Sequence, residues 1–168
     1  MKKMARAWVF GDNLNTDQIT PGRFNMTTDA AALAKACLVE CRPEFSKTVA
    51  KDDAIIAGRN FGCGSSRETA VMALKAAGIR VIFAKSFARI FFRNCINNGI
   101  VPAVADTTAI ADGDSVQIGA DYSLTLAKGR RIIPEISAPV LKIVGEGGTI
   151  PYIRVHGIDS LASLFSAN

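Results

Sequence analysis

The sequence predicts an α/β fold, and two patterns along the chain carry this prediction. In the middle of the chain, apolar runs typical of buried strands alternate with helix-forming runs, so that strand, helix, strand, helix and strand follow within roughly fifty residues. In the last third, short β-rich runs are separated by Gly, Asp and Lys-Gly turns, which is typical of antiparallel strands. We therefore expect parallel strands joined by right-handed crossovers, with antiparallel strands packed on them.

Four elements are expected before the centre of the chain. They are a strand at Ala7–Phe10, a loop over residues 14–28, a helix at Ala30–Leu38 and an irregular polar connection over residues 42–53. The strand ends at a Gly-Asp-Asn turn. The helix follows Asp29, whose carboxylate suits an N-cap because it can accept a hydrogen bond from the first helical turn.

A glycine-rich turn, Asn60–Glu68, organises the middle of the chain. It follows the apolar run Ala54–Ala57, which predicts a buried strand, and it precedes helix-forming residues from Thr69 to Ala77. Ser65 and Glu68 have the spacing of a capping box, so we expect the helix to begin at Ser65 and the serine that follows it. Because a helix N-terminus carries unpaired N–H groups and the positive end of the dipole, this turn predicts a small-anion site.

More elements are expected beyond this turn. They are strands at Ile79–Ala84 and Ile100–Val104, a helix at Phe87–Asn97 capped by Ser86, short strands at Ser115–Ile118, Tyr122–Leu126, Arg130–Ile133 and Val140–Val144, a short segment over residues 150–155, and a weakly specified tail over residues 156–168. Because proline has no N–H to donate, Pro102 indicates that its strand lies at a sheet edge or that Pro102 stands at the start of the strand. We find no repeat or low-complexity linker, and expect one domain over residues 1–168 with its core at about residues 5–156.

The composition is that of a globular protein, with 49% hydrophobic and 21% charged residues. No apolar run reaches the roughly 20 residues that span a bilayer. The basic start of the chain is not followed by the apolar segment of a secretory signal, so we expect a cytoplasmic protein without membrane contact. The net charge of +5 is spread along the chain without a Lys/Arg block, which disfavours nucleic acid and suits a small acidic substrate.

The four cysteines, at positions 37, 41, 63 and 95, raise the question of a metal site or of disulfides. No CxxC pair occurs and the single histidine, His156, is distant in sequence, so no zinc or iron–sulfur site is expected in this chain. Disulfides are rare in cytosolic proteins. We expect reduced and mostly buried thiols, with Cys63 as the exception because its loop position can expose it.

The residues that could carry chemistry are Ser65, Ser66 and Arg67. A bare serine pair is typical of a helix cap, but the flanking glycines and the guanidinium of Arg67 favour an anion site with a reactive hydroxyl. A serine nucleophile needs a nearby base, and with His156 as the only histidine we expect no hydrolase triad within the chain. The spacings of a GxSxG elbow and of a P-loop are both absent from this turn.

Three other polar residues stay open between a structural and a functional interpretation. Asp17 is either an ordinary turn residue or a carboxylate of the site. Ser86 and Arg89 are either a second cap with an anion contact or a cap beside a solvated cation. Composition and spacing alone thus indicate a small-anion site on an α/β domain that lacks the groups of a complete enzyme.

Three segments, Gly11–Ile19, Gly58–Glu68 and Ala84–Ile90, occur in this order along the chain. Together they resemble the small, swivelling subunits of the aconitase superfamily, in particular the family of 3-isopropylmalate dehydratase small subunits. The resemblance implies a three-layer β/β/α swivelling domain that closes over a large subunit, in a heterodimer or heterotetramer. It implies that this chain binds no cofactor, and that the partner carries a [4Fe–4S] cluster whose open iron acts as a Lewis acid on the departing hydroxyl. A homo-oligomer stays possible for the isolated subunit.

The same resemblance implies a hydro-lyase that interconverts 2-isopropylmalate and 3-isopropylmalate in leucine biosynthesis, and a role for each site residue. Ser65 would remove and return the carbon-bound proton, Ser66 and Arg67 would bind a substrate carboxylate, and Asp17 would pair with a histidine of the large subunit. A serine alkoxide needs strong positive potential, which Arg67 and a helix N-terminus can supply in a site dried by closure.

The loop Gly22–Thr28 is implied to set specificity. Relatives that process tricarboxylates, such as homoaconitase, carry an arginine at about the position of Met26, which is apolar and adaptable here. We therefore expect Asn25 and Met26 to contact an apolar substituent on the malate skeleton. Arg23 would approach the substrate only if the loop alignment shifted. Citramalate, 2,3-dimethylmalate and the homoaconitase reaction remain alternatives, and a stand-alone anion-binding module is a more distant one.

Overall fold

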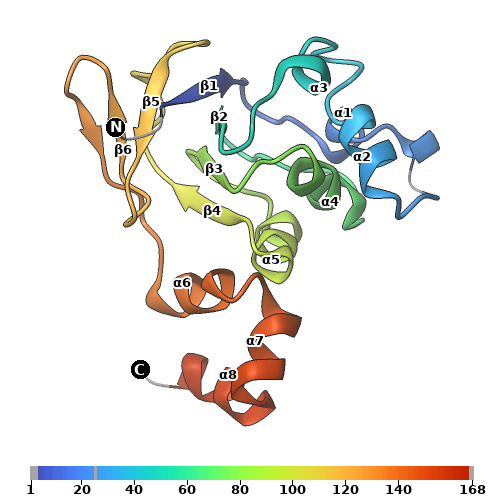
Figure 1. Ribbon diagram of the computed structural model, residues 1–168, viewed down its shortest axis with the longest axis vertical. Coiled ribbons are helices and arrows are strands. Elements are labelled where there is room, and N and C mark those ends of the chain that lie inside the picture. Colours follow the sequence, from blue (N-terminus) through green and yellow to red (C-terminus); the bar gives the residue numbers. More distant parts are fainter. Residues whose placement is uncertain (1–3, 25, 167–168) are drawn as a thin grey trace.

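A seven-stranded mixed sheet forms the centre of the computed structural model, which describes residues 4–24 and 26–166 (Figure 1). The strand order is β4-β3-β2-β1-β5-β6-β7. The strands are β1 (Ala5–Val9), β2 (Ala54–Ala57), β3 (Val81–Ala84), β4 (Val101–Val104), β5 (Ser115–Ile118), β6 (Leu124–Leu126) and β7 (Arg131–Ile132). Neighbours among β1 to β4 pair in parallel, whereas β5, β6 and β7 continue the sheet from β1 by antiparallel pairing.

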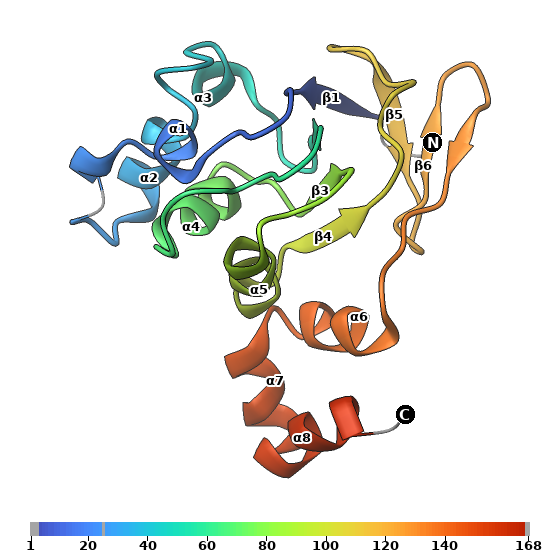
Figure 2. The same ribbon diagram turned by 180° about the vertical axis from the view of Figure 1, so that it is seen from behind.

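The helices and the 3₁₀ turn lie mostly beside the parallel strands or at the end of the chain. They are α1 (Thr16–Ile19), η1 (Gly22–Phe24), α2 (Ala30–Ala36), α3 (Phe45–Thr48), α4 (Thr69–Ala76), α5 (Arg89–Asn98), α6 (Ala138–Gly145), α7 (Thr149–His156) and α8 (Ile158–Ser166). Seen from behind, α7 and α8 extend away from the sheet beyond α6 (Figure 2). Among the described residues, no helix is long and apolar enough to cross a bilayer.

Successive residues of the parallel strands feed two separate cores. Ile55 and Ile82 pack with Leu33, Leu74 and other helical side chains in one core. Their neighbours on the opposite sheet face belong to a second core, to which β5, β6 and β7 each contribute buried side chains. The β5–β6 hairpin stands at an angle to the parallel strands, so the sheet curls over its own face (Figure 1). The three layers are therefore strand, strand and helix, which confirms the expected β/β/α architecture and explains the continuous apolar runs.

Most predicted strands and the three predicted helices are confirmed, with boundaries that differ by a few residues. The helix after Asp29 begins as expected, because the Asp29 carboxylate accepts a hydrogen bond from Ala32 N. Pro102 lies in β4, an edge strand of the sheet, where its missing N–H costs no ladder bond to a further strand. The predicted loop over residues 14–28 contains a short helix, α1, because Asn15 and Gln18 form a reciprocal capping box.

The strand predicted at Val140–Val144 is wrong, since these residues belong to α6. Pro139 stands in the first turn of α6, where proline is well tolerated. Val140, Ile143 and Val144 are buried at helical spacing, so the apolar run follows a period of 3.6 and not of 2. Helices α7 and α8 likewise replace the short segment and weakly specified tail expected after residue 149.

The connection over residues 42–53, expected to be irregular, contains α3 and is tied to the sheet by two charged side chains. Asp53 is buried and accepts hydrogen bonds from Arg6 N (2.9 Å), Trp8 Nε1 (3.1 Å) and Ala50 N (2.9 Å). The Arg42 guanidinium bonds to both carboxylate oxygens of Asp112. Asp53 thus fixes β1 at Arg6 and Trp8, and the Arg42–Asp112 pair fixes its end, because Arg42 donates to the Val9 carbonyl and Asp112 accepts from Val9 N.

Replacing Asp112 with asparagine is expected to lower the free energy of unfolding at neutral pH by about 1 kcal/mol, the size typical of a partly exposed charged network. The hydrogen bond from Arg42 lowers the pKa of Asp112 in the folded protein. A carboxylate with a depressed folded-state pKa stabilises the fold above its unfolded pKa, and this contribution is lost as the pH falls through the folded value. Urea unfolding at several pH values should show the two proteins converging in acid. An equal difference between them at pH 7 and well below pH 3 would contradict this assignment.

Candidate active site

Three loops meet at the carboxyl ends of β1, β2 and β3, the edge at which parallel sheets generally bind ligands. The loops after β1 and β2 run side by side: Gly62 N donates to the Leu14 carbonyl (2.8 Å), and Thr16 N donates to the Cys63 carbonyl (2.9 Å). Asn15 and Cys63 form an isolated parallel bridge. The glycine-rich turn is therefore held as an extension of the sheet and is not a free loop.

The loop after β3 completes this arrangement, and it corrects the role expected for Ser86. Ser86 does not cap α5, whose N-cap is Ala88 without a side-chain hydrogen bond. The Ser86 hydroxyl instead accepts a hydrogen bond from Asn60 N (2.8 Å), and its carbonyl accepts one from Phe61 N (3.0 Å). Arg89, the other residue of that pair, lies exposed in the first turn of α5.

Gly62 is required where the turn passes α5. Its φ is +77°, a conformation that side chains rarely adopt, and a Cβ placed there would lie 2.1 Å from Cγ of the buried Phe91. Phe91 also contacts Phe61 edge-to-face, with ring centroids 5.2 Å apart. Glycine thus allows the backbone to pack directly against the Phe61–Phe91 pair. This contact fixes the path of the backbone that leads to Ser65 and Ser66.

The capping box expected between Ser65 and Glu68 is not formed, and the helix does not begin at the serines. The N-cap of α4 is Glu68, which has no side-chain cap bond. Ser65 Oγ instead accepts hydrogen bonds from Arg67 Nε (2.9 Å) and Arg67 N (3.3 Å), while the Glu68 carboxylate accepts one from Asn98 Nδ2 of α5. The Ser65 and Glu68 side chains therefore bind other groups and do not cap α4. The positive charge next to Ser65 Oγ is that of the Arg67 guanidinium.

Ser65 and Arg67 of the glycine-rich turn and Asp17 of a separate motif line one narrow crevice. Its other lining residues are Thr16, Thr20, Thr69 and Ala70, so α1 forms one wall and the start of α4 the other. Thr16 Oγ1 accepts a hydrogen bond from Ser65 N (3.0 Å), which ties the two walls together. The arrangement can present a hydroxyl, a guanidinium and a carboxylate to one small molecule.

The remaining predicted residues lie outside this crevice. Ser66 is exposed, and its carbonyl accepts a hydrogen bond from Asn94 Nδ2 (3.2 Å). The Met26 side chain is 96% exposed, so the structure gives it no packing role among the described residues. Asn25 lies outside the described residues. Contact of these three residues with a substrate stays a prediction.

Sequence reasoning missed Thr16 and Thr20 as neighbours of Ser65. Residues 16, 17 and 20 share one face only because residues 16–19 form a helix. The Asn-x-x-Gln spacing of Asn15 and Gln18 was the signal that could have identified this helix.

The cysteines are all free, and two are buried. Burial raises the pKa of Cys37 and Cys95 far above the usual value of a thiol. Cys41 is the exposed thiol and Cys63 is half-buried, so the expectation that Cys63 alone would stand out is wrong. Within residues 4–24 and 26–166, no group of three His, Cys, Asp or Glu side chains could hold a metal ion.

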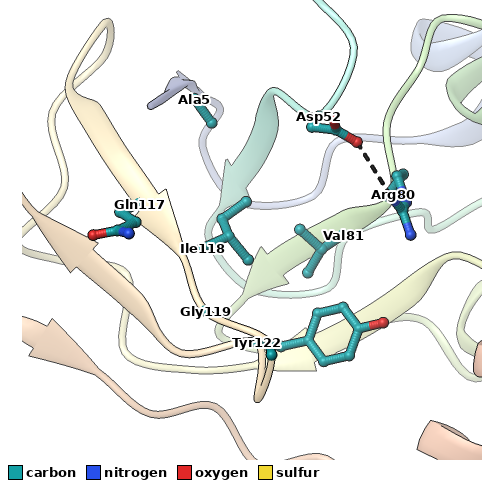
Figure 3. Close-up of a pocket in the computed structure, with 9 residues that line it drawn as sticks. Ala5, Asp52, Arg80, Val81, Gln117, Ile118, Gly119 and Tyr122 are labelled. Carbon is teal, nitrogen blue, oxygen red and sulfur yellow. Dashed lines mark hydrogen bonds and ion pairs between the residues drawn. The ribbon is translucent and has the colours of Figure 1, made fainter. Parts of the chain in front are cut away.

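A larger cavity, of about 640 Å³, lies at the other end of the parallel strands (Figure 3). Its lining comes from the amino ends of β1 and β3 and from the β5–β6 hairpin, and it contains none of the predicted site residues. Val81, Ile118 and Tyr122 give it apolar walls, and Arg80 pairs with Asp52 at 3.5 Å. Size favours this cavity over the crevice, but the residues predicted to carry chemistry, Ser65, Arg67 and Asp17, line the crevice.

Comparison with known proteins places this chain in one family. The family model of the aconitase C-terminal domain matches residues 3–107, which include all three site loops. The chain belongs to this aconitase C-terminal domain family.

Particular relatives cover nearly the whole chain. The 3-isopropylmalate dehydratase small subunit 2 of Archaeoglobus fulgidus is 44% identical over 94% of this chain and 98% of its own. The methanogen homoaconitase small subunit of Methanocaldococcus jannaschii is 43% identical over 89% of each chain. The crystal structure of a 3-isopropylmalate dehydratase from Methanocaldococcus jannaschii superposes with a TM-score of 0.87, at 42% identity, over 97% of this chain and 99% of that one.

Proposed function

We propose that this chain is the small subunit of a hydro-lyase that interconverts 2-isopropylmalate and 3-isopropylmalate by dehydration and rehydration, a step of leucine biosynthesis in the cytoplasm. The observation that carries the proposal is the 44% identity, over 98% of its length, to a relative named as such a small subunit. The crevice supports it, because Ser65, Arg67 and Asp17 converge there. We take residues 1–168 to form a single swivelling domain.

The active site is completed by a large subunit. The crevice lining includes a hydroxyl, a guanidinium and a carboxylate but no histidine, and His156 lies on α7 with its Nε2 3.0 Å from Glu146 Oε1. The base can come from this chain, but an acid and a site for the leaving hydroxyl must come from another chain. A [4Fe–4S] cluster of the large subunit would supply Lewis-acid assistance to the departing hydroxyl, and no described group of this chain would ligate it.

The residues of this chain handle the proton and the substrate carboxylate. Ser65, deprotonated, takes the proton from the substrate carbon and returns it during rehydration. Arg67 and Ser66 bind a substrate carboxylate, for which the planar guanidinium is well suited. Asp17, exposed on α1 at the rim of the crevice, pairs with a histidine of the large subunit and sets its protonation.

Met26 is the residue that we propose selects the substrate class. The homoaconitase relative makes a tricarboxylate substrate the second candidate. Met26 is exposed on the loop after η1 and offers an apolar, flexible surface, which favours an alkyl substituent over a charged one. Citramalate and 2,3-dimethylmalate would meet the same surface.

Replacing Met26 with arginine is expected to shift the preference toward a tricarboxylate, by about tenfold or more in the ratio of kcat/KM values. The added guanidinium would face the substituent of the malate skeleton and would attract the extra carboxylate of a tricarboxylate. Leu141→Arg, which also introduces an arginine at an exposed apolar position but on α6, is the matched control and should leave the ratio unchanged. An unchanged ratio in the Met26 variant would remove this loop from the specificity assignment.

A substrate panel tests the function itself. The chain is purified anaerobically with an iron–sulfur large subunit, and 2-isopropylmalate, citramalate, 2,3-dimethylmalate and homocitrate are compared by kcat/KM. We expect 2-isopropylmalate to give the highest value. A higher value for homocitrate would assign the chain to a homoaconitase, and no turnover of any compound would refute the hydro-lyase proposal.

A further inference from the structure

One buried hydroxyl beside Ser65 has no hydrogen-bond partner. Thr20 is 2% exposed, and its Oγ1 is the only fully buried side-chain oxygen or nitrogen, among the residues that the structure describes, without a partner. The backbone of Thr20 is satisfied, because its N–H donates to the Thr16 carbonyl at the end of α1. An unpaired buried hydroxyl costs stability, so its retention calls for a reason.

The position of Thr20 indicates that its unpaired hydroxyl is more than a packing defect. Thr20 lines the same crevice as Ser65, Arg67 and Asp17. Two other buried threonines are paired in the usual way: Thr16 Oγ1 accepts from Ser65 N (3.0 Å), and Thr107 Oγ1 donates to the Ala57 carbonyl (2.8 Å). The hydroxyl without a partner is thus the one at the proposed site of chemistry.

The hydrogen bonds of Ser65 indicate to which acceptor the Thr20 hydroxyl could donate. In the free chain, Ser65 Oγ accepts from Arg67 Nε at 2.9 Å and from Arg67 N at 3.3 Å. The proposed function requires the Arg67 guanidinium to bind a substrate carboxylate, which withdraws one of these donors from Ser65. The deprotonated oxygen of Ser65 then needs a replacement donor within the crevice.

We propose that the Thr20 hydroxyl is this donor, and that it turns toward Ser65 Oγ when substrate draws the Arg67 guanidinium away. No bond is formed or broken at Thr20, which keeps its proton and stabilises the negative oxygen of Ser65. Thr20 is therefore a positioning residue. The inference rests on the proposed function, because that function makes Ser65 the base. A donor with no other partner suits this role, since it gives up no existing hydrogen bond when the charge develops.

The stability of the free chain tests the premise. Thr20→Val keeps the shape of the side chain and removes its hydroxyl, so we expect Tm to stay unchanged or to rise by about 2–5 °C. Thr107→Val is the matched control: it removes a bonded hydroxyl and leaves the Ala57 carbonyl without that donor, so Tm should fall by about 2–5 °C. A fall of similar size in Thr20→Val would show that the Thr20 hydroxyl is bonded, and would overturn the inference.

The kinetics of the complex with the large subunit test the role. Thr20→Val should lower kcat for 2-isopropylmalate by about 10–100-fold with KM within about twofold. The acid limb of the kcat profile, which reports the base in the substrate complex, should shift to higher pH, because loss of a donor to the charged form raises the pKa of the base. Thr20→Ser retains a hydroxyl and should restore both rate and profile. Thr107→Val should leave the profile unchanged.

Three kinetic outcomes would contradict the inference: wild-type turnover in Thr20→Val, a loss of rate without a shift of the acid limb, or no rescue by Thr20→Ser. Each of these leaves the proposed function standing, since the wild-type complex is still active. The proposed function fails separately, when the wild-type complex turns over none of the alkyl malates.

Discussion

Replacing Ser65 with alanine is expected to lower kcat of the complex by about a thousandfold or more. The variant removes the oxygen that takes the substrate proton and that accepts the hydrogen bond from Arg67 Nε (2.9 Å). Thr16 Oγ1 already accepts the Ser65 N–H, and Ser66 is exposed beyond the crevice lining. Steady-state turnover of 2-isopropylmalate measures the loss, and calorimetric titration of the large subunit measures assembly, which should be unchanged.

Ser163→Ala is the matched control for this change. Ser163 lies on α8, where its hydroxyl donates to the Asp159 carbonyl within the same helix (2.9 Å). We expect wild-type kcat from this variant. If Ser65→Ala retained a rate near that of the wild type while it bound the large subunit normally, another group would have to be the base.

Replacing Arg67 with lysine is expected to lower kcat/KM by about a hundredfold, even though the positive charge is kept. Lysine lacks the planar fork that can bind a carboxylate through two parallel hydrogen bonds. It also lacks the Nε–H that donates to Ser65 Oγ at 2.9 Å in the free chain. Both a higher KM and a lower kcat should therefore be measured, because substrate binding and the potential at the base are affected together.

Arg80→Lys provides the comparison at an arginine remote from the crevice. Arg80 lines the large cavity at the amino ends of the parallel strands, where it pairs with Asp52 (Figure 3). This variant should keep wild-type kinetics. A similar loss in both variants would indicate a general effect of arginine on stability or assembly, and the carboxylate-binding role of Arg67 would be contradicted.

The parallel half of the fold was predictable because its strands are buried on both faces. Ile55 and Ile56 enter different cores, so the whole run is apolar and its length alone indicates a strand. The same rule failed at Val140–Val144, where the residues before the run, including Pro139, indicate a helix start. The β/β/α layering came from family resemblance, and the structure confirms it.

The sequence predicted which residues form the site better than it predicted their hydrogen bonds. Residue patterns made Ser65, Arg67 and Asp17 candidates, the resemblance implied their roles, and the structure brings them to one crevice. The helix caps assigned to Ser65 and Ser86 were wrong because other donors bind their hydroxyls: the Arg67 guanidinium, two residues away, at Ser65, and the distant Asn60 N at Ser86. Thr20 was not identified, because the absence of a partner for a buried hydroxyl depends on how α1 packs against α4 and has no sequence pattern.

The central claim is that this chain holds half of an active site and that its serine serves chemistry completed by another polypeptide. Titration of the chain into a cluster-loaded large subunit, with turnover of 2-isopropylmalate as the signal, tests it most directly. We predict no turnover by either protein alone and a rate that rises to saturation as the chain is added. Turnover by the large subunit alone at the saturated rate, or no rise on addition of a correctly folded chain, would contradict it.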